Sequence, residues 1–384
     1  MNKKESALPH VGKRKQDTQQ SNGVNIIHTP EDFKLHFEYF QRFKLQHDSQ
    51  NLLFDQGLIH DKSQYYNCHR NYFASIVSLM RNPDSNRAYY DGIVTCSNSK
   101  ACPVCAPRIM GKRSAEIRSA VWRWLNLASG NTCYMLTLTF AHKITDSLEY
   151  LLKLFSMAVQ IFWANGSVKR LFNRNGYRGR ITSLEIQYSR HNGFHPHQHI
   201  LFFSRKSMFD IEKLRHFWLS ALSSVGLSGL SDIALDLIEA RSAENYLTKI
   251  SSEMALGNLK QGRGINHYSP MQLLAEVGAG YVWAKDVWCE YFKATKGIHS
   301  LYWSKHLKAF FGINEVSDNQ IASGVTDRNL QRFLDFPAYY FRRLSVDHKA
   351  TLRKYAAFNQ WDKASALLDE LNIIHWKEYS EQLL

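Results

Sequence analysis

The sequence predicts an α+β fold, in which a central antiparallel sheet is flanked by helices, with a zinc-binding module before it and further helices after it. Two observations predict this class. Strand-like and helix-like segments follow one another without the regular βαβ order of a parallel sheet. Hydrophobic residues make up 44% of the 384 residues, which is enough for a sizeable core.

The hydrophobic pattern predicts the elements in order along the chain. Amphipathic helical patterns occupy 31–60, 111–128, 147–164, 211–226 and 244–256. Strand patterns rich in β-branched and aromatic residues occupy 133–140, 179–189 and 194–203, and a turn-prone Arg-His-Asn-Gly joins the last two. A strand is also expected within 231–240, and the pattern after about residue 265 is mostly helical.

This order divides the chain into five segments: a disordered basic tail (1–30), an N-terminal helical segment (31–64), a cysteine zinc module (65–115), a sheet-bearing domain (116–315) and a C-terminal helical region (316–384). The tail lacks the apolar run of a secretory signal. The best apolar stretch, LLKLFSMAVQIFWA, is too short to span a membrane and contains Lys153. We therefore expect a cytoplasmic protein with no membrane partner, whose cysteines are thiols or metal ligands.

The formal net charge of +14 predicts attraction to polyanions, with nucleic acid first and an anionic membrane second. Segment 165–180 is the best candidate for binding DNA, because Phe172 and Tyr177 are interleaved with basic side chains and no acidic side chain is present. Its basic residues are Lys169, Arg170, Arg174, Arg178 and Arg180. A merely solvated charged loop is the alternative.

Three histidines alternate in the stretch NGFHPHQHILFF, so His195, His197 and His199 share one face of the expected strand. Glu185 on the partner strand offers a carboxylate. A His-His-carboxylate set with open positions suits Mg or Mn and would also accept Zn. Scattered surface histidines and a solvated glutamate are the alternative, but three histidines within five residues favour a metal site.

The cysteines before the sheet-bearing domain predict a structural zinc. The stretch CSNSKACPVC places Cys96, Cys102 and Cys105 in a C-x5-C-x2-C arrangement, and a C-x2-C turn supplies two corners of a zinc tetrahedron. Cys68 is the expected fourth ligand, with His69 as the alternative. Buried structural thiols without a metal are the competing interpretation.

The stretch ENYLTKISSEM places Tyr246 and Lys249 on one face of an expected helix. A tyrosine hydroxyl can attack phosphorus when a metal withdraws charge from the phosphate and a nearby cation lowers the proton affinity of the tyrosine. The pattern is weak alone, and it gains weight from the histidine strand upstream in a basic protein.

With these motifs the chain resembles the rolling-circle replication initiators (Rep) of small bacterial plasmids, within the wider class of HUH endonucleases. The motifs are LTLTF (136–140), His197-Gln198-His199 within HPHQHILFF, and YLTK (246–249). Segment 288–313 is similar to the family's C-terminal signature, a Thr-Lys-Gly followed by a Trp-Ser. Gln198 replaces the usual apolar residue and faces away from the metal. The resemblance covers roughly residues 65–315.

The resemblance implies an HUH-like nicking domain over 116–315 that nicks and rejoins single-stranded origin DNA to start plasmid rolling-circle replication. A metal at the histidines would polarise the scissile phosphate, and Tyr246, assisted by Lys249, would attack to form a 5′-phosphotyrosine. The freed 3′-hydroxyl would prime synthesis with the host replication helicase and polymerase. The resemblance leaves open whether the protein forms a homodimer.

Each round also needs a second cleavage, for which enzymes of this group can use a water activated by a Glu one helical turn before the tyrosine. Ser242 occupies that position here and cannot be a base. Glu239, seven residues before Tyr246, is the expected substitute if the helix extends that far, with Glu253 as the mirror option. A tyrosine from a second subunit is the alternative.

Three other functions are compatible with parts of the sequence. A transposase or relaxase shares the same chemistry, and only the C-terminal signature favours plasmid replication. A zinc-containing DNA-binding regulator without chemistry explains the charge and the cysteines but leaves the histidine strand and Tyr246 unexplained. A metal-dependent hydrolase of small molecules fits the histidines but not the charge.

Overall fold

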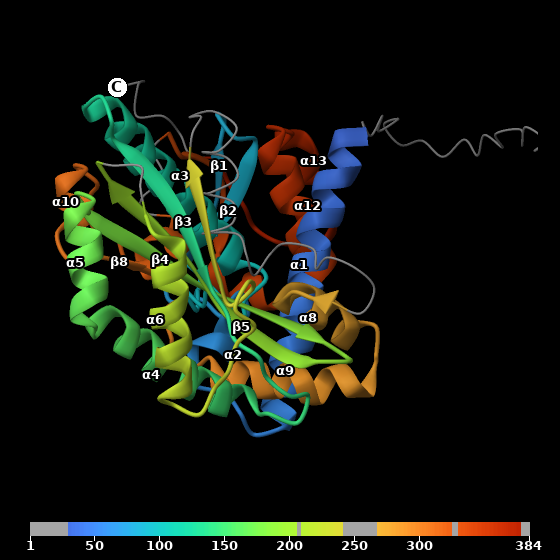
Figure 1. Ribbon diagram of the computed structural model, residues 1–384. Coiled ribbons are helices and arrows are strands. Elements are labelled where there is room, and N and C mark those ends of the chain that lie inside the picture. Colours follow the sequence, from blue (N-terminus) through green and yellow to red (C-terminus); the bar gives the residue numbers. More distant parts are fainter. Residues whose placement is uncertain (1–29, 206–208, 241–266, 325–328, 378–384) are drawn as a thin grey trace, which may run out of the picture.

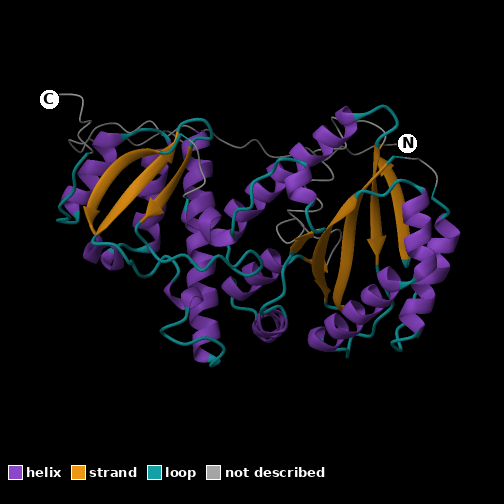
Figure 2. Ribbon diagram, turned by 90° about the vertical axis from the view of Figure 1, so that its left-hand side faces the viewer, coloured by secondary structure: helices purple, strands orange, loops and turns teal. Residues whose placement is uncertain are grey.

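Two antiparallel sheets organise the computed structural model, which describes residues 30–205, 209–240, 267–324 and 329–377. Figure 2 shows the sheets at opposite ends of the molecule, with helices around and between them. The predicted antiparallel sheet flanked by helices is confirmed, and a second, smaller sheet accompanies it.

The larger sheet has the strand order β6-β3-β5-β4-β7, and β8 also pairs with β4. Its strands are β3 (Thr132–Leu138), β4 (Gly179–Ser189), β5 (Gly193–Ser204), β6 (Leu235–Ala240), β7 (His267–Tyr268) and β8 (Leu301–Trp303). All of these pairings are antiparallel. The strands expected from alternation are β3, β4 and β5, and the strand expected within 231–240 is β6 (Figure 1).

A tight hairpin joins β4 to β5 and sets their register. Gly193 closes it with a φ of +79°, and a Cβ there would lie only 3.1 Å from the Ile144 carbonyl oxygen, so the position requires glycine. The register places Glu185 opposite His197. Pro196 is tolerated inside β5 because β3 pairs with β5 only as far as Gln198, which leaves the proline with a strand on one side.

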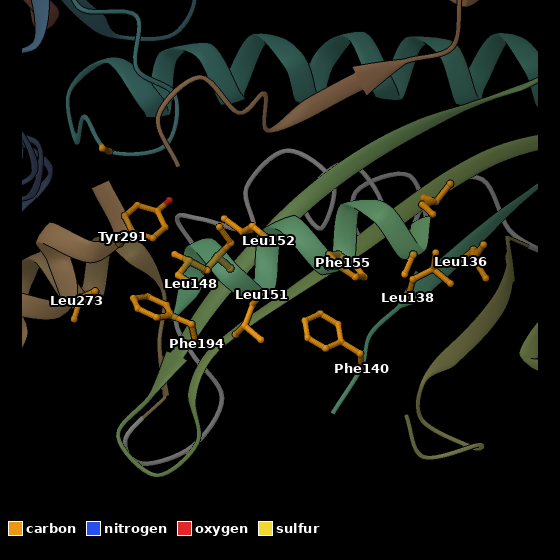
Figure 3. Packing of buried hydrophobic residues seen from close by; sticks show 14 of the residues in the cluster. Leu136, Leu138, Phe140, Leu148, Leu151, Leu152, Phe155, Phe194, Leu273 and Tyr291 are labelled. Atoms are coloured by element: carbon orange, nitrogen blue, oxygen red, sulfur yellow. The ribbon is translucent and has the colours of Figure 1, made fainter. Parts of the chain in front are cut away.

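Different helices pack on the two faces of the larger sheet. One face packs on α4 (Leu148–Ala164) and α6 (Ile211–Ser223), and Figure 3 shows Leu136 of β3 near Phe155 of α4 in this core. The other face packs on α3 (Cys105–Leu127), where Trp124 contributes to a core that includes Met135 and Leu201. Beyond that core, the α3 side of the sheet carries polar residues, which form the site described below.

The smaller sheet joins segments that are far apart in the sequence. Its order is β2-β1-β9, formed by β1 (Ile76–Asn82), β2 (Arg87–Asp91) and β9 (Gln331–Pro337). It is covered by α1 (Pro30–Asp55), α12 (Val346–Ala357) and α13 (Trp361–Glu370) in one hydrophobic cluster. The other helices are α2 (Gln64–Asn67), α5 (Gly166–Arg174), α8 (Pro270–Gly278), α9 (Val282–Ala294), α10 (Leu307–Phe310), α11 (Asp318–Ser323) and the 3-10 helix η2 (Ala338–Arg343).

The long helix α1 connects the two units. Tyr39 and Phe43 in its first half belong to the core of the smaller sheet. Leu53 in its last turn belongs to the larger core, and the Ser49 hydroxyl accepts a hydrogen bond of 3.0 Å from the Trp288 indole of α9. The single helix α1 therefore contributes side chains to both hydrophobic cores.

Two expectations for the C-terminal region need correction. The region 316–384 was expected to be helical, but it contains β9, in which Phe333–Phe336 are all buried. A strand buried on both faces has no period of two, so alternation gives no signal for it. The region is also not separate from the zinc module, because β9 pairs with β1 within 65–115.

No helix among the described residues is, by itself, both long and apolar enough to cross a membrane. Taken together, α4 and α5 do meet these criteria, but they are bent by 60° at the break between them. The apolar residues Leu151 and Phe155 of α4 are buried in the core of the larger sheet.

Because Phe336 of β9 is fully buried between the segments that form the smaller sheet, we expect Phe336→Ala to lower the free energy of unfolding by about 3–5 kcal/mol. The control is Phe73→Ala, since Phe73 precedes β1 and is 72% exposed, and it should change stability by less than about 0.5 kcal/mol. Urea unfolding followed by circular dichroism measures both. Equal midpoints for the two variants would contradict the pairing of β9 with β1.

Candidate active site and metal centres

The hairpin β4–β5 brings Glu185, His197 and His199 together on one face of the larger sheet. The Oε2 atom of Glu185 lies 3.1 Å from Nε2 of His199 and 3.4 Å from Nε2 of His197. One ligand atom from each of the three residues falls within 4.8 Å of the others, so a single ion can contact all three. These three of the four predicted ligands form the cluster.

The glutamate is prepared to act as an anionic ligand. It is only 4% exposed, and burial acts to raise the pKa of its carboxyl. Hydrogen bonds and charge from His197 and His199 outweigh burial and hold the pKa of Glu185 well below its usual range. The Gln187 amide donates a hydrogen bond of 2.8 Å to the Oε1 atom, which orients the carboxylate.

Neighbouring groups leave the Nε2 atoms of both histidines facing the glutamate. The Thr137 hydroxyl lies 3.2 Å from Nδ1 of His199, and the carbonyl oxygen of His195 lies 3.4 Å from Nδ1 of His197. Such partners fix the tautomer and the ring orientation of metal-binding histidines. A His-His-carboxylate set with open positions fits Mn, Mg or Zn.

The structure separates His195 from the predicted ligand set. Its Nε2 lies 2.9 Å from the Thr139 hydroxyl and its Nδ1 lies 2.9 Å from Nε2 of His142, so both ring nitrogens have protein partners. Burial, followed by the neighbouring His197 and His142, lowers the pKa of His195 to about 3. His195 therefore lies beside the cluster without joining the three ligand atoms that come together, and its predicted place as a ligand stays a prediction.

Three side chains of the site were missed by the sequence interpretation. Thr137 and Thr139 lie in the LTLTF motif, which was singled out by resemblance alone, and His142 follows it. The structure gives the motif a physical role, because its alternate hydroxyls contact His199 and His195 on the neighbouring strand. The sequence signal for these contacts was the pair of threonines at alternate positions of one strand, which places both hydroxyls on the same face as the histidines of a neighbouring strand.

The predicted nucleophile Tyr246 and its partner Lys249 lie outside the described residues, as does Glu253. Glu239 is described, and it lies in strand β6 rather than in a helix. It pairs with Tyr134, which pairs with Phe202, and this register puts Glu239 on the face opposite Glu185. Its expected placement on the tyrosine's helix is therefore wrong.

The predicted cysteines form the second cluster, and its geometry fits zinc. The Sγ atom of Cys68 lies 4.0 Å from that of Cys102 and 3.6 Å from that of Cys105, and Cys96 and Cys105 are 3.9 Å apart. Four sulfurs about 2.3 Å from a tetrahedral zinc would be about 3.8 Å apart. His69, the alternative ligand, lies beside the cluster with Nδ1 3.2 Å from Sγ of Cys68.

Donors from distant segments surround the cysteine sulfurs. The Gln46 amide of α1 lies 3.1 Å from the sulfurs of both Cys68 and Cys102. Backbone N–H groups of Cys96 and Cys105 donate to sulfurs at 3.3 Å. Such donors stabilise thiolates, which are the form that zinc binds.

The predicted DNA-binding stretch 165–180 forms helix α5 and the start of β4. Lys169, Arg170, Arg174 and Arg178 are exposed, and Arg180 is half-buried against the Trp163 ring at 3.9 Å. Phe172 is a core residue and cannot stack on a base. Arg180 precedes Glu185 by about 17 Å of strand and points to the opposite face, so this stretch does not line the metal cluster.

A cavity of about 720 Å³ adjoins strand β8, which pairs with β4 of the hairpin. Its walls come from loop 96–100 of the cysteine cluster, from α3 and from segment 295–303, which holds most of the Thr-Lys-Gly and Trp-Ser signature. Leu301 in its wall pairs with Ser183, and Ser183 pairs with His199. The cavity is thus one strand away from the metal-binding histidines.

In fold and site, the chain is a mixed α/β protein with a His-His-carboxylate cluster and a four-cysteine cluster. A family model described as replication protein matches residues 92–219, which include three of the clustered cysteines and both histidines. The protein "Protein rep" of Streptomyces lividans is 24% identical over 298 residues, which are 58% of this chain and 65% of that protein. The predicted resemblance to plasmid replication initiators is confirmed by these matches.

A neomycin resistance protein of Streptomyces cyanogenus is 27% identical over 135 residues, which are 29% of this chain and 30% of that protein. This chain therefore matches less than two thirds of the length of each of these relatives. No solved structure matches the chain significantly.

We expect one tightly held zinc ion per chain, and Cys102→Ser should remove it and lower the free energy of unfolding by about 4 kcal/mol or more. Elemental analysis of protein purified without chelator measures the zinc. The control is Cys289→Ser, since Cys289 lies outside the cluster and should leave zinc unchanged. Zinc retained by the Cys102 variant, or absent from the unaltered protein, would refute the site.

At the histidine cluster, we expect the double variant His197→Ala/His199→Ala to lose Mn²⁺ binding in calorimetry. Thr137→Val should weaken it about 10-fold or more, because the hydroxyl orients His199. The matched control is Thr182→Val, since Thr182 lies on the other face of β4 and should leave Mn²⁺ affinity unchanged. Equal affinities in all the variants would place the ion elsewhere.

Proposed function

We propose that this protein is a replication initiator that nicks one strand of plasmid origin DNA through a phosphotyrosine, using an HUH-like domain over 116–315. The observation that carries the proposal is the convergence of Glu185, His197 and His199 in a segment that matches replication proteins. The net charge of +14 is consistent with a DNA substrate.

The chain's own residues would divide the chemistry as follows. Glu185, His197 and His199 would hold a Mg or Mn ion, which would supply Lewis-acid polarisation of the scissile phosphate. The Tyr246 oxygen attacks phosphorus and loses its proton, the bond from phosphorus to the 3′ oxygen breaks, and that oxygen gains a proton. Lys249 stabilises the tyrosine oxygen as it becomes anionic. Reversal of the same step rejoins the strand.

The adjoining cavity would take the nucleotides next to the scissile phosphate. It lies one strand from His199 and is lined by Lys100 and Lys296, whose charges suit a phosphate backbone, while Arg113 in the same wall is paired with Glu116 and Asp318. Lys100 is buried, and no ion pair within 4.0 Å links it to another described residue. Phe292 and Trp303 in the same walls offer ring faces to bases.

The freed 3′ end would be extended by the host helicase and polymerase in the bacterial cytoplasm. The second cleavage would then need a group on the metal face of the sheet, so a tyrosine of a second subunit fits better than Glu239. Transposases and relaxases remain the alternative with the same chemistry, and the match to replication proteins favours initiation. A regulator without chemistry would not explain the buried carboxylate between two histidines.

The test is transfer of label from DNA to protein. With Mn²⁺ and a random pool of single strands labelled at the 3′ end, we expect a covalent adduct on a denaturing gel, and strands labelled at the 5′ end should give only shortened free DNA. Tyr246→Phe should abolish the adduct, whereas Tyr268→Phe, the control in β7, should retain it. An adduct on the Tyr246 variant, or none on the unaltered protein, would reject the assignment.

A further inference from the structure

A groove of about 520 Å³ lies between the last turns of α3 and the helix α10. Three large apolar side chains are exposed along it: Trp122 is 57% exposed, Leu127 is 59% exposed and Phe310 is 39% exposed. Trp124 of the same helix, by contrast, is buried in the core. Exposed apolar side chains that gather at one groove indicate a surface that contacts another molecule.

The groove lies on the same side of the larger sheet as the histidine cluster, but apart from it. Phe311, which lines the groove, packs on Phe203 of β5, and their ring centres are 4.8 Å apart. Phe203 and His199 lie on the same face of β5, and four residues, or about 13 Å of strand, separate them. The groove is therefore a separate site on the side of the sheet where the proposed nicking takes place.

The charged side chains at the groove are basic. Arg123 lines it and donates a hydrogen bond to the Phe311 carbonyl, and the guanidinium of Arg178 lies 4.0 Å from the centre of the Phe310 ring. None of the described residues that line the groove is acidic. The one acidic residue of α3, Glu116, is buried in an ion pair within the helix. An anionic ligand that also has flat apolar parts complements such a surface.

Arg178 connects the groove to the stretch 165–180, which the sequence predicts to bind DNA. The start of β4 packs closely on α10, because a Cβ at Gly179 would lie 2.9 Å from a methyl carbon of Leu307. Helix α5, with its exposed Lys169, Arg170 and Arg174, ends four residues before Arg178. One end of the predicted stretch therefore adjoins the groove rather than the metal cluster.

We propose that this groove binds single-stranded nucleic acid, with bases stacked on Trp122 and Phe310 and phosphates paired with Arg123 and Arg178. Stacking of bases on aromatic rings beside basic side chains is a common way to hold a single strand without reading its sequence. A duplex does not fit in this way, because its bases already stack on one another. The site adds an anchor for the strand outside the metal cluster, and it rests on the proposed function only for the choice of DNA as the ligand.

The test measures binding alone, so failure of the nicking proposal does not affect it. The parent protein is the full chain carrying Tyr246→Phe, without added Mn²⁺ or Mg²⁺, and the probe is a labelled oligothymidine of about 16 nucleotides followed by anisotropy. Trp122→Ala should weaken affinity about 10-fold, whereas Trp122→Phe, which keeps a ring, should weaken it less than about 3-fold. Arg178→Gln should weaken affinity and reduce the salt slope by about one. Affinity for a duplex should be equal in the parent and in Trp122→Ala.

Matched controls come from the helices on the opposite face of the sheet. Tyr150→Ala removes a ring that is 50% exposed on α4, and Lys213→Gln removes a charge from a side chain that is 68% exposed on α6. Both controls should bind oligothymidine as the parent protein does. Circular dichroism and zinc content establish that each variant is folded.

A strand of abasic sugar-phosphate units separates stacking from charge. The parent and Trp122→Ala should bind this strand equally, because it has no base to stack. The proposal is overturned if folded Trp122→Ala binds oligothymidine as Tyr150→Ala does, which is the result expected if the groove takes a protein partner instead. It is also overturned if Trp122→Ala weakens binding of the abasic strand and of oligothymidine by the same factor. If Trp122→Ala does not fold, equal affinities of Arg178→Gln and Lys213→Gln for oligothymidine overturn it.

Discussion

The register of the β4–β5 hairpin is the constraint on which the candidate active site depends. Side chains alternate between the faces of a strand, so a slip of one residue would move Glu185 to the face opposite His197 and His199. The apolar residues of the other face hold the register, because a slip would bury the histidines and expose Ile200 and Phe202. The hairpin glycine fixes the turn, and the hydrophobic core thereby positions the metal ligands.

The cysteine cluster plays a corresponding part for the smaller sheet. Its four sulfurs come from two separate stretches, and Gln46 of α1 donates to two of them. Lys349 of α12 reaches the backbone at His69, so helices from both ends of the chain meet at the cluster. A metal here would secure contacts between distant segments, whose loop closure opposes folding entropically.

Sequence patterns predicted the features that depend on neighbouring residues. The features that depend on pairing between distant segments were seen only in the structure. Alternation predicted the histidine strand and its partner, and cysteine spacing predicted the sulfur cluster, because each depends on a few neighbouring residues. The segment LDLIEA suits a strand as well as the end of a helix, and pairing with β3 decides in favour of the strand, which moves Glu239 to the wrong face. The buried stretch Phe333–Phe336 of β9 and its pairing with β1 depend on residues far away in the sequence, so no window of sequence contains them.

Two cavities adjoin the cysteine cluster, where a zinc ion would be held. The loop from Cys96 to Lys100 lines the larger cavity, and His69 and Cys105 line a second cavity of about 220 Å³. A zinc ion at the cysteines would therefore hold one wall of each cavity in place. If the larger cavity takes DNA, as proposed, such a wall would restrict how the strand is presented to the histidine cluster without touching the reacting atoms.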